Sequence, residues 1–509
     1  MKLQISDDSF ARAMGSENVE FAFKTHGVEP TRNGSLGLAW LEPVVQLLNG
    51  DQEIVSEFTN VAVEEVPKIV AYFQSMRDQD NGDTNLQDAT ESTTSTHPFL
   101  TQQHRLVFDR AGIRPPLDLP SFKLLEDLLT QDPNQIIAGM ETSGLRGRGG
   151  AGFPAFIKWR TVADTPADQK YIVCNADEGD SGTFSDRMLM EGDPFKLIEG
   201  MIISGFATGA TQGFIYLRSE YPVAKEYLDQ ALEMAYSAGL LGKTVLNSNF
   251  SFDIDMLIGA GAYICGEETS LLESLEGKRG QIKVKPPVPA IAGLFEKPTL
   301  VHNVISLASV PGIFEIGPES YAQLGVGRST GTMPFQLSGN IKQGGLIELP
   351  FGPTVNELIY NYGNGTLSGR PIRTVQIGGP LGAYLSESEF DTPLTYEAMA
   401  EIGAGIGHGG LVVFDDTVNL KEQAEYAFEF CEIESCGKCT PCRIGSIRGK
   451  EALRQFNSNT VDARTLVVIE DLCEVMEKAS LCQMGGMTPI PVRSAIQKFP
   501  EDFISEQTT

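Results

Sequence analysis

Short apolar runs alternate with amphipathic helical patterns through most of this 509-residue chain. Within residues 98–332, apolar strands are expected at 170–174 and 213–217, each flanked by segments with helical periodicity. This alternation is typical of an α/β sheet whose ligands bind at the loops that follow the strands. The pattern therefore predicts an α/β domain over residues 98–332.

Different patterns flank this region. Residues 1–76 alternate helical and strand-like segments, which predicts a small α/β module. Residues 77–97 are rich in Asp, Asn, Gln, Ser and Thr and are expected to form a linker, because they bury too little apolar surface to offset their ordering entropy. Short strands dominate 333–415, which predicts a β-grasp-like domain, and nearly all of 416–509 follows a helical pattern. The expected fold class is α/β multidomain.

Charge narrows the class of partner. The chain has 67 acidic and 39 basic residues, a net charge of −28, and no large basic block. This argues against nucleic-acid or anionic-membrane binding as the main role. The N-terminus turns acidic before any apolar stretch, which argues against a secretory signal, and a helix followed by a strand explains the low-charge stretch 200–217 better than a membrane span. A cytoplasmic protein without membrane insertion, binding proteins and small ligands, is expected.

The cysteines are the most informative residues. None of the eight lies in the first 173 residues. Cys436, Cys439 and Cys442 have C-x2-C-x2-C spacing, and Cys482 follows 40 positions later; three close thiolates and a distant fourth fit a [4Fe-4S] cluster. A four-cysteine zinc site is the alternative, although such sites usually pair two C-x2-C knuckles. Cys473 competes for the fourth position, but it lies in a helical run and is expected to pack as a small apolar residue.

A glycine-rich loop at 147–154 precedes a helical stretch that contains Lys158. Its glycines match G-x-G-x-x-G, but no clear strand precedes them, so an ordinary Rossmann fingerprint is not supported. Backbone N–H groups of such a loop can still bind phosphate, with Arg148 and Lys158 expected to add positive potential. A flexible surface loop is the alternative.

Three further segments bear on a ligand site. Residues 175–183 follow a predicted strand and could place polar groups around a flavin ring or a ribose. The glycine-rich segment 259–269 leads into a helix, where Glu267 and Glu268 are read either as functional or as a solvated helix start. Residues 405–410 also match G-x-G-x-x-G, but their strand comes after them, so a nucleotide site is not expected there. The five scattered histidines are expected to be packing or surface residues.

These motifs together resemble the family of flavin-containing, NADH-oxidising subunits of respiratory complex I. The resemblance rests on residues 147–154, 175–187, 261–277, 285–303 and 435–442. Relatives of that family include the diaphorase subunits of NAD-reducing hydrogenases and the beta subunits of NAD-dependent molybdenum formate dehydrogenases. The resemblance implies a Rossmann-like domain for FMN and NAD(H), a β-grasp (ubiquitin-like) domain and a C-terminal helical bundle with a [4Fe-4S] cluster.

The resemblance also implies site residues. Those expected at FMN are Gly147, Arg148, Gly149, Gly150, Lys158, Asn175, Asp177, Glu178, Gly266, Glu267 and Asn303. Those expected at NAD(H) are Phe153, Asp180, Tyr263, Glu268 and Lys285. The cluster ligands would be Cys436, Cys439, Cys442 and Cys482. Three positions depart from the family pattern: Asp180-Ser181 replaces Glu-Pro, His302-Asn303 replaces Asn-Asn, and Val288 stands where some members have an aromatic residue.

The N-terminal module narrows the resemblance. Residues 31–43 resemble a thioredoxin-like domain related to the [2Fe-2S] subunits of these complexes, but residues 1–76 contain no cysteine and cannot hold such a cluster through thiolates. This cluster-free extension looks most like the formate dehydrogenase beta subunit and is read as a docking module.

The resulting prediction is a subunit that reduces NAD+ with electrons from formate. Its partners would be a thioredoxin-like [2Fe-2S] subunit and a large molybdenum and iron–sulfur catalytic subunit. The alternatives are a hydrogenase diaphorase subunit, the NADH-oxidising subunit of complex I, and a scaffold that has lost its flavin, which the intact glycines and Lys158 argue against.

Overall fold

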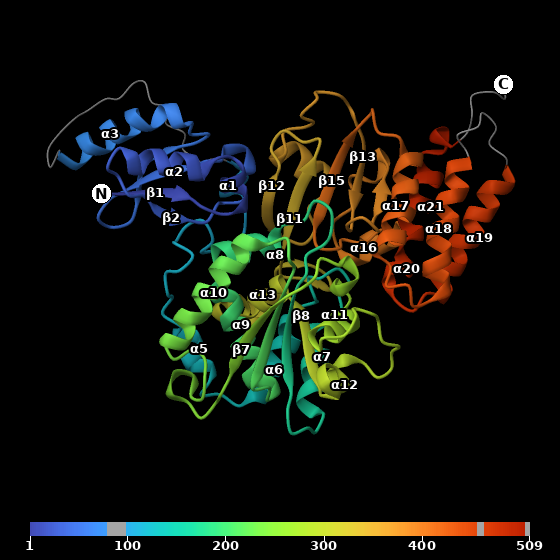
Figure 1. Cartoon of the computed structure of the whole chain (residues 1–509), viewed down its shortest axis with the longest axis horizontal. Helices are drawn as coiled ribbons and strands as arrows, with labels where there is room; N and C mark the ends of the chain where they lie inside the picture. The colour runs from blue at the N-terminus through green and yellow to red at the C-terminus, as the bar shows by residue number, and fades with distance from the viewer. Residues whose placement is uncertain (79–97, 456–462, 504–509) are drawn as a thin grey trace.

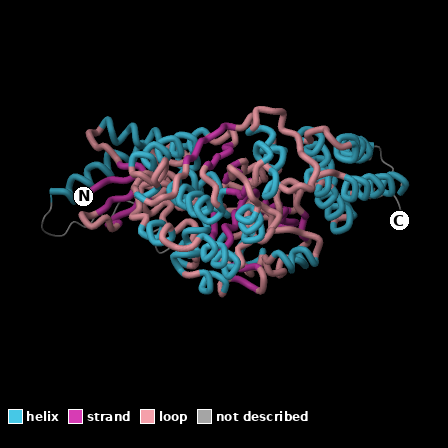
Figure 2. The backbone as a smooth tube through the Cα atoms, turned by 90° about the horizontal axis from the view of Figure 1, so that it is seen from below, coloured by secondary structure: helices cyan, strands magenta, loops and turns pink. Residues whose placement is uncertain are grey.

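The computed structural model describes residues 1–78, 98–455 and 463–503, so most of the expected linker at 77–97 lies outside the described residues. Figure 1 shows an N-terminal module, a central α/β domain below a second sheet, and a group of C-terminal helices. The N-terminal strands and the C-terminal helices lie at opposite ends of the long axis (Figure 2). Among the described helices, none combines the length and the hydropathy that a bilayer crossing requires.

The N-terminal module is a mixed four-stranded sheet with helices. Its strands are β1 (Lys2–Ser6), β2 (Thr31–Asn33), β3 (Val45–Leu48) and β4 (Ile54–Phe58), in the order β2-β1-β3-β4. β1 is parallel to β2 and antiparallel to β3, and β3 is antiparallel to β4. The helices are α1 (Ser9–Ala13), α2 (Ser16–Thr25) and α3 (Val66–Asp78). Leu3 and Ile5 of β1 pack with Phe23 of α2 and Val70 of α3 in a core of its own.

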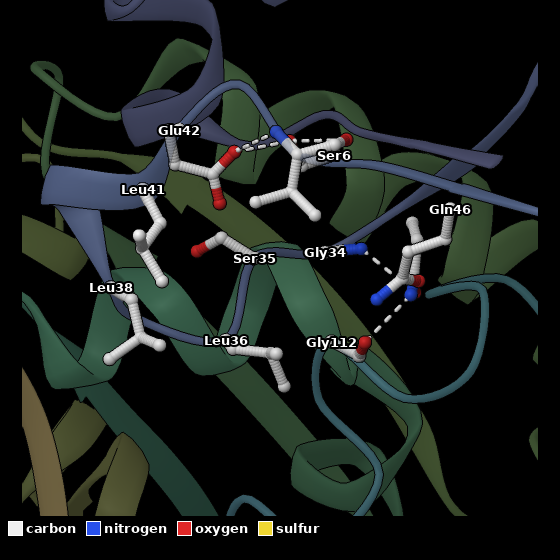
Figure 3. A pocket seen from close by; sticks show the side chains of 11 residues that line it. Ser6, Gly34, Ser35, Leu36, Leu38, Leu41, Glu42, Gln46 and Gly112 are labelled. Atoms are coloured by element: carbon white, nitrogen blue, oxygen red, sulfur yellow. Dashed lines mark hydrogen bonds between the residues drawn. The ribbon is translucent and has the colours of Figure 1, made fainter. Parts of the chain in front are cut away.

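A small cavity of about 20 Å³, enough to hold one water molecule, is lined by residues of this module and by Gly112 of the central domain (Figure 3). Glu42 is among its lining residues and is only 2% exposed. Its carboxylate accepts hydrogen bonds from the Val44 N–H (3.0 Å) and the Ser6 hydroxyl, and no Lys, Arg or His is among the described residues that line the cavity. Burial, aided by the charge of Asp8, raises the pKa of Glu42 to about 8.

The central domain is a parallel sheet, as the alternating pattern predicts. Its strands are β5 (Tyr171–Ala176), β6 (Gln212–Leu217), β7 (Asp253–Ile258) and β8 (Thr299–Asn303), in the order β7-β6-β5-β8. The apolar runs at 170–174 and 213–217 are confirmed as β5 and β6. From β5 the chain adds β6 and β7 on one side of the sheet and then β8 on the other side. The strand order therefore changes direction at β5, and ligands of open α/β sheets bind at the carboxyl ends of strands at such a point.

Helices cover this sheet (Figure 1). They include α6 (Pro133–Ser143), α7 (Ala155–Asp164), α8 (Ser185–Gly192), α9 (Pro194–Thr208), α10 (Pro222–Ser237), α11 (Glu268–Leu275) and α13 (Val304–Ile316). α9 and α13 cross closely because Gly200 has no side chain: a Cβ there would lie 2.0 Å from the Leu307 carbonyl oxygen. This buried pair supports the sheet from beneath β5 and β8, whose ends carry the predicted site.

The second sheet and the helical bundle complete the fold. The sheet contains β11 (Thr332–Gly339), β12 (Gly345–Pro350), β13 (Ile372–Ile377), β14 (Ala383–Leu385) and β15 (Gly410–Asp415), in the order β12-β11-β15-β13-β14. β11 and β15 are parallel, and the other neighbours are antiparallel. The bundle contains α17 (Leu420–Glu434), α18 (Thr440–Gln455), α19 (Ala463–Ala479), α20 (Gln483–Met487) and α21 (Pro489–Lys498). The strand-rich and helix-rich patterns therefore correspond to observed elements.

Candidate functional site

The glycine-rich loop between α6 and α7 closes on itself as a tight hairpin. The Gly147 N–H donates to the Phe153 carbonyl (2.8 Å), and Gly150 has a φ of 101°, a conformation that side chains disfavour. Two other elements hold the hairpin. The Tyr396 hydroxyl donates to the Gly147 carbonyl (3.2 Å), and Ser306 of α13 accepts a loop N–H (2.8 Å). The loop is therefore fixed by its own backbone, by α13 of its own domain and by Tyr396 of the domain that contains the second sheet.

The Arg148 side chain makes contacts that the sequence did not predict. It is buried and donates to the carbonyls of Thr330 (2.8 Å) and Thr332 (3.1 Å) and to the Tyr321 hydroxyl (3.0 Å). The guanidinium carbon also lies 4.8 Å from the centre of the Phe351 ring. This guanidinium ties the α/β domain to the segment that leads into the second sheet. Because its hydrogen-bond partners here are uncharged, it remains a cation close to the loop, and its role in binding an anion stays a prediction.

Two lysines and two glutamates form an ionic group beside the loop. Lys158 Nζ lies 2.9 Å from Glu268, and Lys285 Nζ lies 2.7 Å from Glu268 and 2.9 Å from Glu267. Glu267 also caps α11 by accepting the Thr269 N–H (2.9 Å). Burial alone would raise the pKa of Glu268, but Lys158 and Lys285 hold it at about 2. The site thus has two cations, each already paired, on the side where a phosphate is expected.

The loop after β5 places its predicted polar residues at different depths. The Asn175 amide donates to the Gly266 carbonyl (2.7 Å), which ties this loop to the segment before α11. Asp177 is partly buried, and desolvation raises its pKa to about 7; its buried Oδ2 has no hydrogen-bond partner among the described residues. Glu178 is buried beneath the loop and accepts two N–H groups at the start of α8 (both 3.1 Å). The Glu178 side chain therefore caps a helix, whereas Asp177 carries the unsatisfied atom.

The remaining polar residues that the resemblance implies at FMN and NAD(H) are Asn303, Asp180 and Tyr263. Asn303 ends β8 and caps α13 by accepting the Ser306 N–H (3.2 Å). Its amide donates to Asp186 of α8 (3.3 Å). The Tyr263 hydroxyl donates to Asp180 Oδ1 (2.8 Å).

The glycine loop, the loop after β5, the start of α11 and the end of β8 therefore meet at the carboxyl edge of the sheet. Lys158 links α7 to this edge, because its ammonium also donates to the Val301 carbonyl of β8 (3.3 Å). Phe153, which the resemblance places at the adenine, belongs to the loop itself and is 46% exposed. The structure thus brings the predicted flavin and dinucleotide residues to one place.

The structure adds a segment that the sequence reasoning set aside. Gly407 forms an isolated β-bridge with Gly150, so residues 405–410 lie directly against the glycine loop. His408 Nδ1 lies 3.3 Å from Asp180 Oδ2. The position of the strand after the glycines still argues against a Rossmann turn at 405–410. It does not prevent these residues from contacting a ligand site in another domain. In the sequence, the glycines around His408 were the feature that could have indicated this contact.

Cys436 and Cys439 lie between α17 and α18, Cys442 lies in the first turn of α18, and Cys482 is the N-cap of α20. The Ser435 hydroxyl lies 3.1 Å from the Cys442 thiol. Burial raises the pKa of Cys482 to about 12, aided by Glu267 and Cys442. Cys473 is fully buried on α19, and the charged groups near it are Arg493, Glu470 and Glu477. Among the described residues, no three Cys, His, Asp or Glu side chains are grouped as ligands of a single metal ion.

The cysteine loop packs against the segment between α11 and Lys285. Lys438 donates to the Ile282 carbonyl (2.6 Å), and the Gln281 amide donates to the Cys436 carbonyl (3.3 Å). The Tyr263 N–H donates to Glu434 near the end of α17 (2.9 Å). The two candidate sites therefore lie on either side of one stretch of chain.

Comparisons with known proteins agree with this geometry. Residues 140–312 match the Nuo51 FMN-binding domain, and residues 422–506 match the NADH-ubiquinone oxidoreductase-F iron-sulfur binding region. The NADP-reducing hydrogenase subunit HndC of Solidesulfovibrio fructosivorans is 42% identical over 395 residues, covering 78% of this chain and 80% of the relative. A subunit of the NADH-quinone oxidoreductase of Aquifex aeolicus is 41% identical over 382 residues, covering 75% of this chain and 88% of the relative.

A solved structure extends the likeness. A crystal structure of an NAD+-reducing [NiFe]-hydrogenase in the air-oxidised state contains a similar chain, with a TM-score of 0.70 and 27% identity. The match covers 99% of this chain and 84% of the other. The protein therefore belongs to the complex I 51 kDa flavoprotein family, which includes HndC and the NADH-quinone oxidoreductase relative, and it is an NAD(H)-dependent oxidoreductase subunit with an FMN-binding domain and a [4Fe-4S]-binding region.

Proposed function

We propose that the glycine-loop site binds FMN and NAD(H), and that the cysteine loop holds a [4Fe-4S] cluster that exchanges single electrons with the flavin. The proposal rests on the segment 268–285, which contacts both sites. At the two ends of this segment, Glu268 and Lys285 pair with each other beside the glycine loop. Between them, the Ile282 carbonyl accepts the ammonium of Lys438 from the cysteine loop. The two centres are thereby held close to each other, as electron transfer requires.

The residues present fit FMN. Gly149 and Gly150 have no side chain that would keep a ligand from the loop backbone, and a Cβ at Gly149 would fill the space beside Asn303, 3.3 Å from the Asn303 Cβ. Asp177 Oδ2 is a buried polar atom that a bound ligand would satisfy. We assign to FMN the residues Gly147, Gly149, Gly150, Lys158, Asn175, Asp177, Gly266, Glu267 and Asn303, with the backbone of Arg148 and the helix-capping Glu178 as support.

The dinucleotide would lie over the exposed side of the same edge. We assign Phe153, Asp180, Tyr263, Glu268 and Lys285 to NAD(H). Phe153 offers a ring for stacking on the adenine, and Asp180 is held in place by the Tyr263 hydroxyl. FMN, when bound, takes a hydride from NADH and gives up its two electrons one at a time. Hydride transfer needs no protein base, so these residues serve to fix the approach of the nicotinamide and to exclude water.

The donor set at the cysteine loop fits a [4Fe-4S] cluster. We propose Cys436, Cys439, Cys442 and Cys482 as the ligands, with Cys473 outside the set. Three of these thiols lie on one turn of chain and the fourth at the start of α20, which packs against α18. Lys438 places a positive charge beside the negative charge that four thiolates bring. A zinc site remains the competing assignment for the same four residues.

For the electron partner, we propose a molybdenum subunit that oxidises formate, with a thioredoxin-like [2Fe-2S] subunit between. The support is the N-terminal module. Its strand order, with β3 antiparallel to both neighbours, is compatible with a thioredoxin-like fold, and residues 1–76 contain no cysteine. A module without cluster ligands suits docking rather than electron transfer. We likewise propose that residues 333–415 form a β-grasp-like domain and that the protein is cytoplasmic.

A hydrogenase partner is the second candidate. The likeness to the NAD+-reducing hydrogenase chain covers 99% of this chain, and therefore includes the N-terminal module. Complex I is a third setting, since the NADH-quinone oxidoreductase of Aquifex aeolicus also contains a relative.

The experiment is to purify the complex from its native host through a tag on this chain and to identify the subunits that accompany it. Recovery of a molybdenum subunit with formate-dependent NAD+ reduction would support the first candidate. Hydrogen-dependent NAD+ reduction by a co-purified hydrogenase would replace it with the second. Membrane quinone-reductase subunits would replace it with the third.

The cluster assignment has a separate test. Cys442→Ser is expected to lose nearly all iron and acid-labile sulfide while keeping FMN, and Cys473→Ala, the matched control, is expected to keep both. Iron loss in Cys473→Ala but not in Cys482→Ala would move the fourth ligand to Cys473. If the wild-type protein contained zinc and no acid-labile sulfide, the four cysteines would be assigned to a zinc site instead of a cluster.

A further inference from the structure

His408 reaches the cofactor edge from the second sheet. It precedes β15 in the segment 405–410, whose Gly407 pairs with Gly150 of the glycine loop. The backbone is held on the other side by Gln336 of β11, whose amide donates to the His408 carbonyl (2.8 Å). The imidazole is therefore placed by the sheet rather than by a free loop.

Three carboxyl groups of the α/β domain face this imidazole. They are Asp180 and Glu178 in the loop after β5 and Asp186 on α8. Burial lowers the pKa of His408, but these acids more than compensate, with Asp180 contributing most, and the pKa is raised to about 9. Tyr263 touches the same Asp180 from the segment before α11, but it is neutral because burial raises its pKa well above the ordinary value. The imidazole is thus cationic at neutral pH.

The two ring nitrogens face different neighbours. Nδ1 lies 3.3 Å from Asp180 Oδ2. Nε2 lies on the side where Gly149 and Asn303 meet: a Cβ at Gly149 would be 3.5 Å from Nε2 and 3.3 Å from the Asn303 Cβ. Among the described residues neither buried nitrogen makes a hydrogen bond. A buried cation with an unused donor is costly, and a ligand acceptor at this point would relieve that cost.

We propose that His408 is a further residue of the cofactor site, which pairs with Asp180 through Nδ1 and donates from Nε2 beside Gly149 to the flavin bound by the glycine loop. This inference rests on the proposed function. Hydride transfer moves two electrons with one proton, so the acceptor gains one negative charge. An adjacent imidazolium stabilises that charge and therefore raises the midpoint potential of the bound flavin.

Asp180 links the imidazole to the α/β domain. Its carboxylate lies between the Tyr263 hydroxyl and the His408 ring. Gly379, which follows β13 of the second sheet, allows the approach, because a Cβ there would clash with the Asp180 carboxyl carbon. The second sheet therefore contributes both the imidazole and the space for its partner.

The test compares His408→Gln with the wild-type protein in flavin binding and in flavin potential. FMN fluorescence quenching on the flavin-depleted protein gives the affinity, and a redox titration of the bound flavin gives the midpoint potential. We expect His408→Gln still to bind FMN, while the NADH:NAD+ ratio that half-reduces the flavin rises about tenfold, the size of one lost charge contact. His26→Gln, on the exposed end of α2, is the control and is expected to leave both unchanged.

The pH dependence separates a charge role from a structural one. The wild-type potential is expected to bend near pH 9, where His408 loses its proton, and His408→Gln is expected to lack that bend. Asp180→Asn is expected to move the bend toward the ordinary histidine pKa of about 6.5. An unchanged potential and an unchanged bend in His408→Gln would overturn the inference. Failure of the wild-type protein to bind FMN would instead overturn the proposed function.

Discussion

A carboxyl group at the cofactor edge and one in the N-terminal module have opposite pKa shifts. Glu268, at the start of α11, has Lys158 and Lys285 within 2.9 Å, and its pKa is held at about 2. Glu42 has two hydrogen-bond donors, no Lys, Arg or His lies among the described residues that line its cavity, and its pKa is raised to about 8. The first carboxyl keeps its charge and holds two ammonium groups in place; the second takes up a proton. The two carboxyl groups therefore differ through their neighbours: two cations stabilise the charge of Glu268, whereas burial beside Asp8 disfavours the charge of Glu42.

Glu42→Gln is the largest expected effect, and it acts on stability. Because the folded pKa is raised above the unfolded value of about 4.3, the wild-type protein loses stability as pH rises from about 4 to 8. Gln has no proton to lose, so the variant is expected to be more stable by up to about 3 kcal/mol at pH 7. Thermal unfolding from pH 5 to 8 measures this, and the advantage is expected to shrink to about 1 kcal/mol at pH 5.

FMN affinity serves as the control for Glu42→Gln, since its cavity lies in a different module from the glycine loop. Parallel stability curves for the variant and the wild-type protein across this pH range would contradict the description of Glu42 as a group that takes up a proton.

The Lys158→Gln substitution removes one of the two cations beside Glu268 and so brings its surroundings closer to those of Glu42. Because of this loss, the pKa of Glu268 is expected to rise toward the ordinary range, and the proposed FMN site loses a positive charge for the phosphate. We expect FMN affinity to fall about 30-fold, or about 2 kcal/mol. Titration of flavin-depleted protein with FMN measures the change.

Lys297→Gln is the matched control for Lys158→Gln, because Lys297 pairs with the exposed Asp168 and is not among the assigned cofactor residues. Equal losses of affinity in the two variants would show that a nonspecific charge effect, rather than a phosphate contact, is responsible.

The sequence predicted the elements that patterning controls. The apolar runs at 170–174 and 213–217 form β5 and β6, and the C-terminal helical pattern forms α17 to α21. These elements could be predicted because the side chains that a strand or a helix buries recur along the sequence with the period of that element. The glycine loop and the residues around Asp177 were also recognisable from local chemistry. The structure then placed these segments at one edge, which local patterns alone do not specify.

What the sequence missed are side-chain directions across domains. Arg148 belongs to the glycine motif, yet its guanidinium bonds to Thr330 and Thr332 at the boundary with the second sheet. His408 sits in a motif that looked unsuitable for a nucleotide, yet it faces Asp180. Both depend on how the second sheet docks, through contacts between residues far apart in sequence. No periodicity encodes such a contact.

The smallest expected effect comes from substitutions in the backbone of the glycine loop, which leave the charges of the cofactor edge unchanged. Gly150 has a φ of 101°, whereas Gly147 has no positive φ and a Cβ there would meet only the Phe153 carbonyl oxygen at 3.7 Å. Gly150→Ala is expected to weaken FMN binding about tenfold, since alanine must distort the loop at a cost of about 1 to 2 kcal/mol, and Gly147→Ala less than threefold. FMN titrations of both variants measure this. If both alanines weakened binding equally, shape would matter little, and the ionic group at Glu268 would account for the difference between the two regions.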